Sequence, residues 1–251
     1  MINYIILISL CIITMFILKI GFNIKFKDIK RIKELGSDKN LNAITDKFPD
    51  NKKICEQILK KLDNKKVKIE ENNESKASLY IAITDKIIIA NIKESFSRIQ
   101  TIAHECLHSI QNRKILLFNF FFSNIYIISF LIFCILILFN VGKEYFNIYI
   151  QTYLIFTLIY IGIRLYLENE AMSKAEYVAK EYMISYMNEN KNMQIDEIDK
   201  IVNGYKEINS IGIPFTNFYL ISINLIKIII LCILAIIWSI FMIKLFFCKS
   251  L

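Results

Sequence analysis

Histidine, proline and glycine are scarce in this chain, and each scarcity limits what the protein can be. Among 251 residues there are two histidines, two prolines and six glycines. The chain therefore has no Pro-rich or Gly-rich linker, and it contains no internal repeat. Its six cysteines are scattered and form no C-x-x-C pair, so we interpret them as ordinary reduced thiols.

Aspartate is absent from four long apolar runs, which cover residues 4–20, 115–139, 148–167 and about 218–247. A bilayer core about 30 Å thick needs about 20 apolar helical residues. The runs also lack the polar face that a helix on the surface of a globular protein shows. We therefore predict an integral membrane protein. The first run lacks a basic leader and a small-residue cleavage site, so we interpret it as an uncleaved anchor.

The net charge of +8 is concentrated in one part of the sequence. Of the 31 lysines and arginines, 20 lie between Gly21 and Lys114, together with 13 acidic residues. This mixture indicates a solvated surface, and because no nucleic-acid-binding motif is present we expect no nucleic-acid partner. The dense cluster from Lys25 to Lys33 follows the first run. By the positive-inside rule it predicts a multi-pass protein of the cell membrane with residues 21–114 and 168–217 in the cytoplasm.

These patterns predict a predominantly α-helical membrane protein with about four transmembrane helices and a small α+β cytoplasmic domain. The expected segments are a membrane anchor (1–20), an α+β segment (21–114), a transmembrane hairpin (115–167), cytoplasmic helices (168–217) and a C-terminal span (218–251). The stretch "NKKICEQILKKLDN" predicts a helix with Ile54, Ile58, Leu59 and Leu62 on one face.

Short strands are predicted in "KVKIE" and in "SLYIAITDKIIIANI", which are rich in β-branched residues; the second stretch is broken by a turn at residues 84–86. A helix is then expected to begin near Ser95 or Ser97 and to run towards the second apolar run. After the hairpin, apolar side chains at helical spacing predict a helix that ends between residues 188 and 192. A shorter helix is expected before Pro214.

The stretch "TIAHECLHSIQ", residues 101–111, contains both histidines in the order H-E-x-x-H. Residues four apart lie on one face of a helix, so His104 and His108 can direct two imidazole nitrogens at one ion. Glu105 lies on the neighbouring edge, where it can take a proton from water without binding the metal. Chance would give this pattern in about one chain in several thousand of this composition. The motif therefore predicts a zinc site with Glu105 as the catalytic base.

A catalytic zinc takes three protein ligands, and no third histidine is present. The third ligand must then be a carboxylate or a cysteine on the same side of the membrane. Residues 115–167 are expected to form a transmembrane hairpin, which enters and leaves the membrane on the same side. The residue that follows the hairpin therefore lies on the same side of the membrane as His108, which precedes it. That residue is Glu168, which we expect to be the third ligand, with Glu170 and Glu176 as competitors. Cys106 points away from the histidine face.

The segments "AHECLHSIQ" and "ENEAMSKA", separated by a membrane hairpin, resemble the bacterial membrane-bound zinc metallopeptidases of the neutral zinc metallopeptidase 2 type. In that family the motif typically reads HEVGHAIQ, and an E-x-x-A segment opens a helix after the hairpin. The resemblance implies a zincin-like domain with His104, His108 and Glu168 as zinc ligands and Glu105 as the base. Two places depart from the family pattern: Cys106-Leu107 replaces a pair that ends in glycine, and Met172 follows the E-x-x-A segment.

The expected activity is hydrolysis of peptide bonds in membrane proteins or membrane-associated peptides, which would be the partners along with the lipid bilayer. Tyr177 and Arg164 are candidates for stabilising the oxyanion. Two interpretations of the strand from Lys86 to Ile92 stay open: it offers its edge to an extended peptide, or it is a plain packed strand. Two alternatives stay open, an inactive metal-binding scaffold and an intramembrane protease of the site-2 type. Lys227 is interpreted as an interfacial lysine that shortens the last span.

Overall fold

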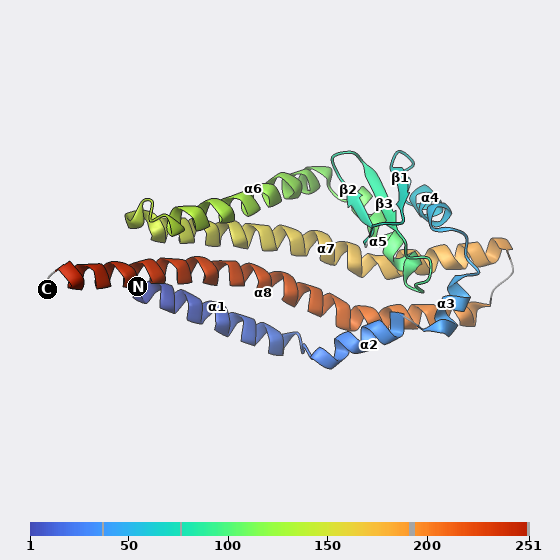
Figure 1. Cartoon of the computed structure of the whole chain (residues 1–251). Coiled ribbons are helices and arrows are strands. Elements are labelled where there is room, and N and C mark those ends of the chain that lie inside the picture. The colour runs from blue at the N-terminus through green and yellow to red at the C-terminus, as the bar shows by residue number, and fades with distance from the viewer. Residues whose placement is uncertain (37, 76, 191–193, 250–251) are drawn as a thin grey trace. The chain divides into compact units, whose positions relative to one another are not determined.

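The computed structural model of the protein describes residues 1–36, 38–75, 77–190 and 194–249. Most of the chain is helical, and a small sheet lies between the fourth and fifth helices in the sequence (Figure 1). The helices are α1 (Ile2–Gly21), α2 (Phe26–Gly36), α3 (Lys39–Thr45), α4 (Asn51–Lys61), α5 (Arg98–Ile110), α6 (Arg113–Leu138), α7 (Phe146–Asn190) and α8 (Ile195–Lys249), with a short 3-10 turn at Lys143–Tyr145. The strands are β1 (Lys68–Asn72), β2 (Leu79–Ile81) and β3 (Lys86–Ala90).

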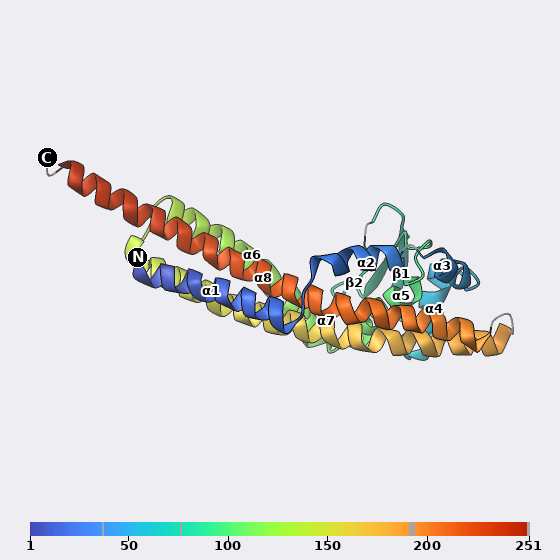
Figure 2. The ribbon, with the colours of Figure 1, turned by 90° about the horizontal axis from the view of Figure 1, so that it is seen from below.

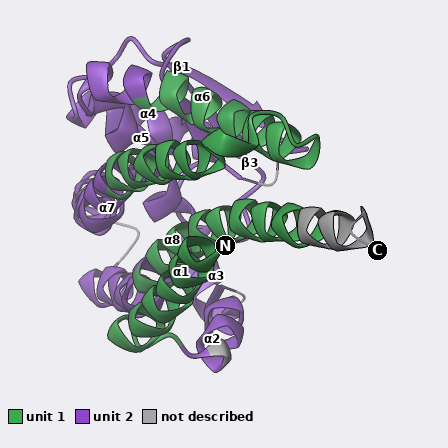
Figure 3. Ribbon diagram, turned by 90° about the vertical axis from the view of Figure 1, so that its left-hand side faces the viewer, with its two compact units in different colours: residues 1–24, 119–165, 214–251 green, residues 25–118, 166–213 purple. Residues whose placement is uncertain are grey.

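The chain divides into two compact units, which Figure 3 draws in different colours. Unit 1 contains residues 1–24, 119–165 and 214–251, and unit 2 contains residues 25–118 and 166–213. Helices α7 and α8 each contribute residues to both units. The described part of the chain includes four helices that are long and apolar enough to cross a membrane, namely α1, α6, α7 and α8. This composition suggests a membrane protein, as the apolar runs predict.

Unit 1 is built from these four helices around one apolar core. Its buried residues come from every helix, among them Cys11 of α1, Tyr126 of α6, Tyr153 of α7 and Cys232 of α8. Many large apolar side chains on the same helices remain exposed. Such exposure would be unfavourable in water, and it is what helices surrounded by lipid require.

Unit 2 contains the sheet, the motif helix α5 and the parts of α7 and α8 that lie outside unit 1. These parts of α7 and α8 run side by side (Figures 1 and 2). The strand order is β1-β3-β2, with β3 parallel to β1 and antiparallel to β2. The prediction that the strand from Lys86 offers a free edge is therefore wrong, because β3 is the central strand. Ile87 and Ile89 on one face of β3 are buried, and Ile88 on the other face is partly buried.

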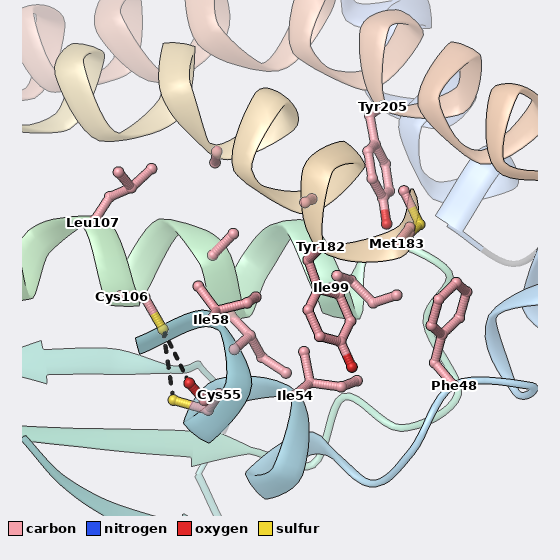
Figure 4. Close-up of a cluster of buried hydrophobic side chains, with 14 of the residues drawn as sticks. Phe48, Ile54, Cys55, Ile58, Ile99, Cys106, Leu107, Tyr182, Met183 and Tyr205 are labelled. Atoms are coloured by element: carbon pink, nitrogen blue, oxygen red, sulfur yellow. Dashed lines mark hydrogen bonds between the residues drawn. The ribbon is translucent and has the colours of Figure 1, made fainter. Parts of the chain in front are cut away.

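Helix α5 lies between α4 on one side and α7 on the other (Figure 4). The predicted face of α4 is confirmed: Ile54, Ile58 and Leu59 are buried, and Leu62 packs against the same core. The alanines of α7 that occur at helical spacing, Ala171, Ala175 and Ala179, are buried as well. Their small side chains allow the backbone of α7 to lie close to α5.

One helix prediction needs correction, and one helix was not predicted. Pro214 lies inside α8 and does not end it. Proline removes one backbone hydrogen bond and bends a helix, but buried residues on both sides of it, from Ile198 to Tyr205 and from Leu225 to Ala235, hold this helix in place. The basic stretch after the first run, which we interpret as a topology signal with some attraction to anionic lipid headgroups, forms the amphipathic helix α2. Asp38 caps the next helix by accepting hydrogen bonds from the backbone of Asn40 and Leu41.

Arg98, the first residue of α5, fixes where the motif helix begins. Its side chain is buried, and its guanidinium donates to the carbonyls of Pro49, Thr45 and Phe48 at 2.8, 2.8 and 3.0 Å. A fourth bond reaches Asn51 Oδ1 at 2.9 Å. Arg98 therefore satisfies the backbone of the connection between α3 and α4, and it joins that connection to α5.

We expect Arg98→Met to lower the free energy of unfolding by at least about 3 kcal/mol, because it leaves several buried carbonyls without donors. Unfolding can be followed with a thiol-reactive dye, since Cys55 and Cys106 are fully buried in the folded protein. Arg113→Met, at an exposed arginine, is the matched control and should leave the transition unchanged. Equal transitions for the two variants would contradict this role of Arg98.

Candidate metal centre

The motif helix presents two different faces. Ile99, Ile102, Ala103 and Cys106 face the core of unit 2 and are fully buried. The histidines lie on the other side, with 18% of the His104 side chain and 12% of the His108 side chain exposed. This division follows from helical periodicity, since residues 104 and 108 are one turn apart. The helix thus holds both imidazoles at the surface of a rigid core.

The two imidazoles converge on one point. Their Nε2 atoms lie 3.0 Å apart, and the rings meet nearly edge to face, with an interplanar angle of 86°. The carboxylate of Glu168, on α7, lies beside them: its Oε2 is 3.4 Å from Nε2 of His104 and 3.8 Å from Nε2 of His108. The structure therefore brings together the three residues that the sequence predicts as ligands.

These separations fit a metal ion. A tetrahedral zinc holds its nitrogen and oxygen ligands at about 2.0–2.1 Å, which places any two of them about 3.3 Å apart. The three measured separations, from 3.0 to 3.8 Å, bracket that value. Two imidazoles and one carboxylate are also a donor set that zinc prefers, and they leave a position for water. His104, His108 and Glu168 form a possible metal site.

Gln111 orients one of the ligands. Its Nε2 donates to the carbonyl of Leu167 at 2.8 Å and to Oε2 of Glu170 at 3.0 Å. Its Oε1 must then accept the hydrogen bond from Nδ1 of His108, which lies 2.8 Å away. Because Nδ1 carries the proton, Nε2 is free to bind a metal. Gln111 also ends α5, so the same residue connects the motif helix to α7.

The competing carboxylates have other partners. Glu170 uses one oxygen for Gln111 and the other for Lys174, 2.8 Å from its Nζ. Glu176 accepts a hydrogen bond from Asn209 at 3.2 Å. Tyr177, one of the two residues considered for the oxyanion, is 73% exposed and lies on the face of α7 opposite Glu168. Neither the Glu170 nor the Glu176 carboxylate belongs to the group of donor atoms that converges at His104 and His108.

Glu105 is buried beside the converging donors without belonging to them. Burial raises the pKa of its carboxyl, against the attraction of His104 and His108, and Glu168 raises it further. The backbone N–H of Tyr80, on β2, donates to this carboxyl. A carboxyl whose pKa is raised towards neutrality accepts and returns a proton more readily than an exposed one.

Burial alone would lower the pKa of His108, but attraction to Glu168 and the hydrogen bond to Gln111 outweigh it and raise the pKa. The imidazole thus has a negative environment, which equally favours a bound cation. Cys106 points away from this site, as expected. Its Sγ lies 3.6 Å from Sγ of Cys55 in the core (Figure 4).

No protein-family model matches the chain, and no curated protein or solved structure is significantly similar to it.

Sequence reasoning missed two groups at the site. Gln111 carries no signal of its own apart from its place at the end of the motif stretch, and its role depends on where α5 stops. The Tyr80 backbone N–H has no sequence signal, because every residue except proline has one. Both groups act on predicted site residues, and neither is a ligand.

The ligand set predicts the metal content of single variants. We expect the purified chain to contain about one zinc per molecule by elemental analysis, and His104→Asn, His108→Asn and Glu168→Gln each to fall below about one tenth of that. Glu170→Gln is the matched control and should retain the metal, since an amide oxygen can still accept from Gln111. Retention by Glu168→Gln together with loss in Glu170→Gln would show that the ligand set is wrong.

Gln111→Ala should weaken zinc binding about 10- to 100-fold, the usual effect of removing the partner of a ligating histidine. The affinity can be measured by titration against a fluorescent chelator. Gln100→Ala is the control: Gln100 is a buried glutamine of α5 that donates to Asn209 and not to a ligand. If both variants lost affinity equally, the effect would come from the helix and not from His108.

Proposed function

We propose that this chain is a membrane-bound zinc peptidase that hydrolyses peptide bonds of membrane proteins or membrane-associated peptides. The observation that carries the proposal is the convergence of His104, His108 and Glu168 within 4.8 Å, beside the buried carboxyl of Glu105. Hydrolysis catalysed by zinc requires three protein ligands and an adjacent acid that does not bind the metal. The resemblance to the neutral zinc metallopeptidase 2 type supports the same activity.

The chemistry divides between the metal and the chain. A bound zinc supplies a Lewis acid, which acidifies water and polarises a carbonyl. Glu105 accepts the proton of the attacking water and then delivers it to the departing amine. Burial raises the pKa of this carboxyl, and the Tyr80 N–H holds its orientation. His104, His108 and Glu168 would hold the ion, and Gln111 keeps His108 in the tautomer that can do so.

Strand β2 supports a way of holding the substrate. It is an edge strand of the sheet, and its Tyr80 N–H reaches the Glu105 carboxyl. An extended peptide that paired with this edge would lie next to the catalytic base. The strand-addition hypothesis therefore moves from β3, which has a neighbour on each side, to β2.

The position of Glu168 supports a substrate at the membrane. It follows directly on the third apolar run, so the site lies within one helical turn of that run. By the positive-inside rule, the site faces the cytoplasm. An intramembrane protease of the site-2 type is less well supported, because the motif lies on α5, ahead of the apolar helix α6.

Glu105→Gln tests the mechanism. We expect the variant to retain zinc, because Glu105 is not among the converging donors, and to hydrolyse peptides about 10²- to 10⁴-fold more slowly than the unmodified chain. The measurement is cleavage of a panel of membrane proteins and peptides by the purified chain in lipid vesicles.

Glu94→Gln, at an exposed glutamate of the same unit, is the control and should cleave normally. Undiminished cleavage by Glu105→Gln would exclude Glu105 as the base. A chain that binds zinc but cleaves nothing in the panel, with or without Glu105, would favour the inactive scaffold instead.

A further inference from the structure

Unit 1 contains a polar cluster around Lys227 that the peptidase site does not use. The ammonium of Lys227 donates to Asn224 Oδ1 at 3.0 Å and lies 4.7 Å from the centre of the Tyr126 ring. The Tyr126 hydroxyl donates to the same oxygen at 2.9 Å and is 3.2 Å from Oγ1 of Thr157. Tyr126, Thr157 and Asn224 are buried, whereas Lys227 is partly exposed.

This cluster lies at the middle of the apolar runs. At 1.5 Å per residue, Tyr126 is about 16 Å along the helix from Ile115, and Thr157 is about 15 Å from Leu167. A hydrocarbon core is about 30 Å thick, so both residues belong near its centre. The contact of the Lys227 ammonium with the Tyr126 ring favours a deeper position for this lysine than the interfacial one expected from the sequence.

The apolar runs supply no counter-charge for a cation at this depth. The four apolar runs contain neither aspartate nor glutamate. In the sequence of unit 1, Glu144 is the one acidic side chain, and it lies in the connection between the second and third runs. Charged side chains within a bilayer are costly and are usually paired. An anionic partner for Lys227 would therefore come from another molecule.

The surface beside Lys227 has the form of a helix-packing seam. Six isoleucines of α8 recur at alternating spacings of three and four residues, and each is 38–56% exposed. They are Ile223, Ile226, Ile230, Ile233, Ile237 and Ile240. This is the heptad spacing with which two membrane helices pack along a left-handed crossing. Lys227 lies at the edge of the seam, four residues after Ile223.

We propose that this seam binds a transmembrane helix of the substrate that carries a carboxyl group near the middle of its span, where it pairs with Lys227. The inference rests on the proposed function only in calling the bound helix a substrate. A second copy of this chain does not fit, because its apolar runs have no carboxyl to offer. The phosphate of a lipid lies at the membrane surface, about 15 Å from the cluster.

The binding test uses full-length protein with Glu105→Gln, which prevents turnover, in phosphatidylcholine vesicles. The chain has a single tryptophan, Trp238 on α8, which donates to the carbonyl of Leu138 at 2.9 Å. Energy transfer from Trp238 to a dansyl-labelled transmembrane peptide without tryptophan reports binding. The peptides are identical leucine-rich helices with a central Glu, a central Leu, or a Glu moved two turns towards one end.

We expect the central-Glu peptide to bind about tenfold more tightly than the central-Leu peptide or the displaced-Glu peptide. Lys227→Met should remove the preference, and Lys143→Met, at an exposed lysine of the same unit, should keep it. Lys227→Glu should instead prefer a peptide with a central lysine, a gain that misfolding cannot mimic.

Equal binding of the Glu and Leu peptides, or a preference that survives Lys227→Met, would overturn the proposal. Loss of the preference when phosphatidylglycerol is added would do so as well, since a lipid anion would then occupy Lys227. Because binding is measured without turnover, the two proposals can fail separately. Cleavage without a Glu preference contradicts only the docking surface, and a Glu preference without cleavage contradicts only the peptidase.

Discussion

The candidate site depends on the hydrogen bonds that Gln111 makes where the motif helix ends. One amide group contacts His108, the backbone of Leu167 and the carboxylate of Glu170. It thereby sets the tautomer of a ligand and joins α5 to the part of α7 that carries Glu168. A ligand set drawn from two helices needs such a connection, because the two histidines share one helix and the third ligand does not. The precision of the site comes from this contact and from the core beneath it.

That core explains why α5 can hold its histidines in a fixed direction. Cys106 and the isoleucines of the buried face pack against α4, and the alanines of α7 close the other side. Arg98 anchors the first residue of the helix through four acceptors, so both ends of α5 are held by side-chain hydrogen bonds. Buried side chains in a close-packed core have little freedom to shift. The metal donors are therefore preorganised by residues that never touch them.

The sequence was sufficient to predict features that follow from residue spacing within one helix or from the order of neighbouring helices. The H-E-x-x-H interval predicted two converging imidazoles, and the hairpin between the second and third runs predicted that Glu168 would return to them. Strand order was not predictable, because it depends on which strands pair across unit 2 and not on the residues of β3. The prediction at Pro214 failed for a similar reason. The conformational preference of proline favours the end of a helix at this position, whereas the packing of buried residues before and after Pro214 favours one continuous helix. The role of Gln111 needed the position of α7.

Both functional inferences concern charged groups that a bound partner of opposite charge would complement. At the metal centre, two imidazole nitrogens and a carboxylate oxygen lie 3.0 to 3.8 Å apart, and a cation bound among them would attract all three. In unit 1 the sign is reversed, since a cation lies at the depth of Tyr126 in runs that contain no acid. Arg98 shows that this chain can surround a buried charge with its own acceptors. We propose that binding partners complete the other two places, a metal ion at one and a carboxyl-bearing helix at the other.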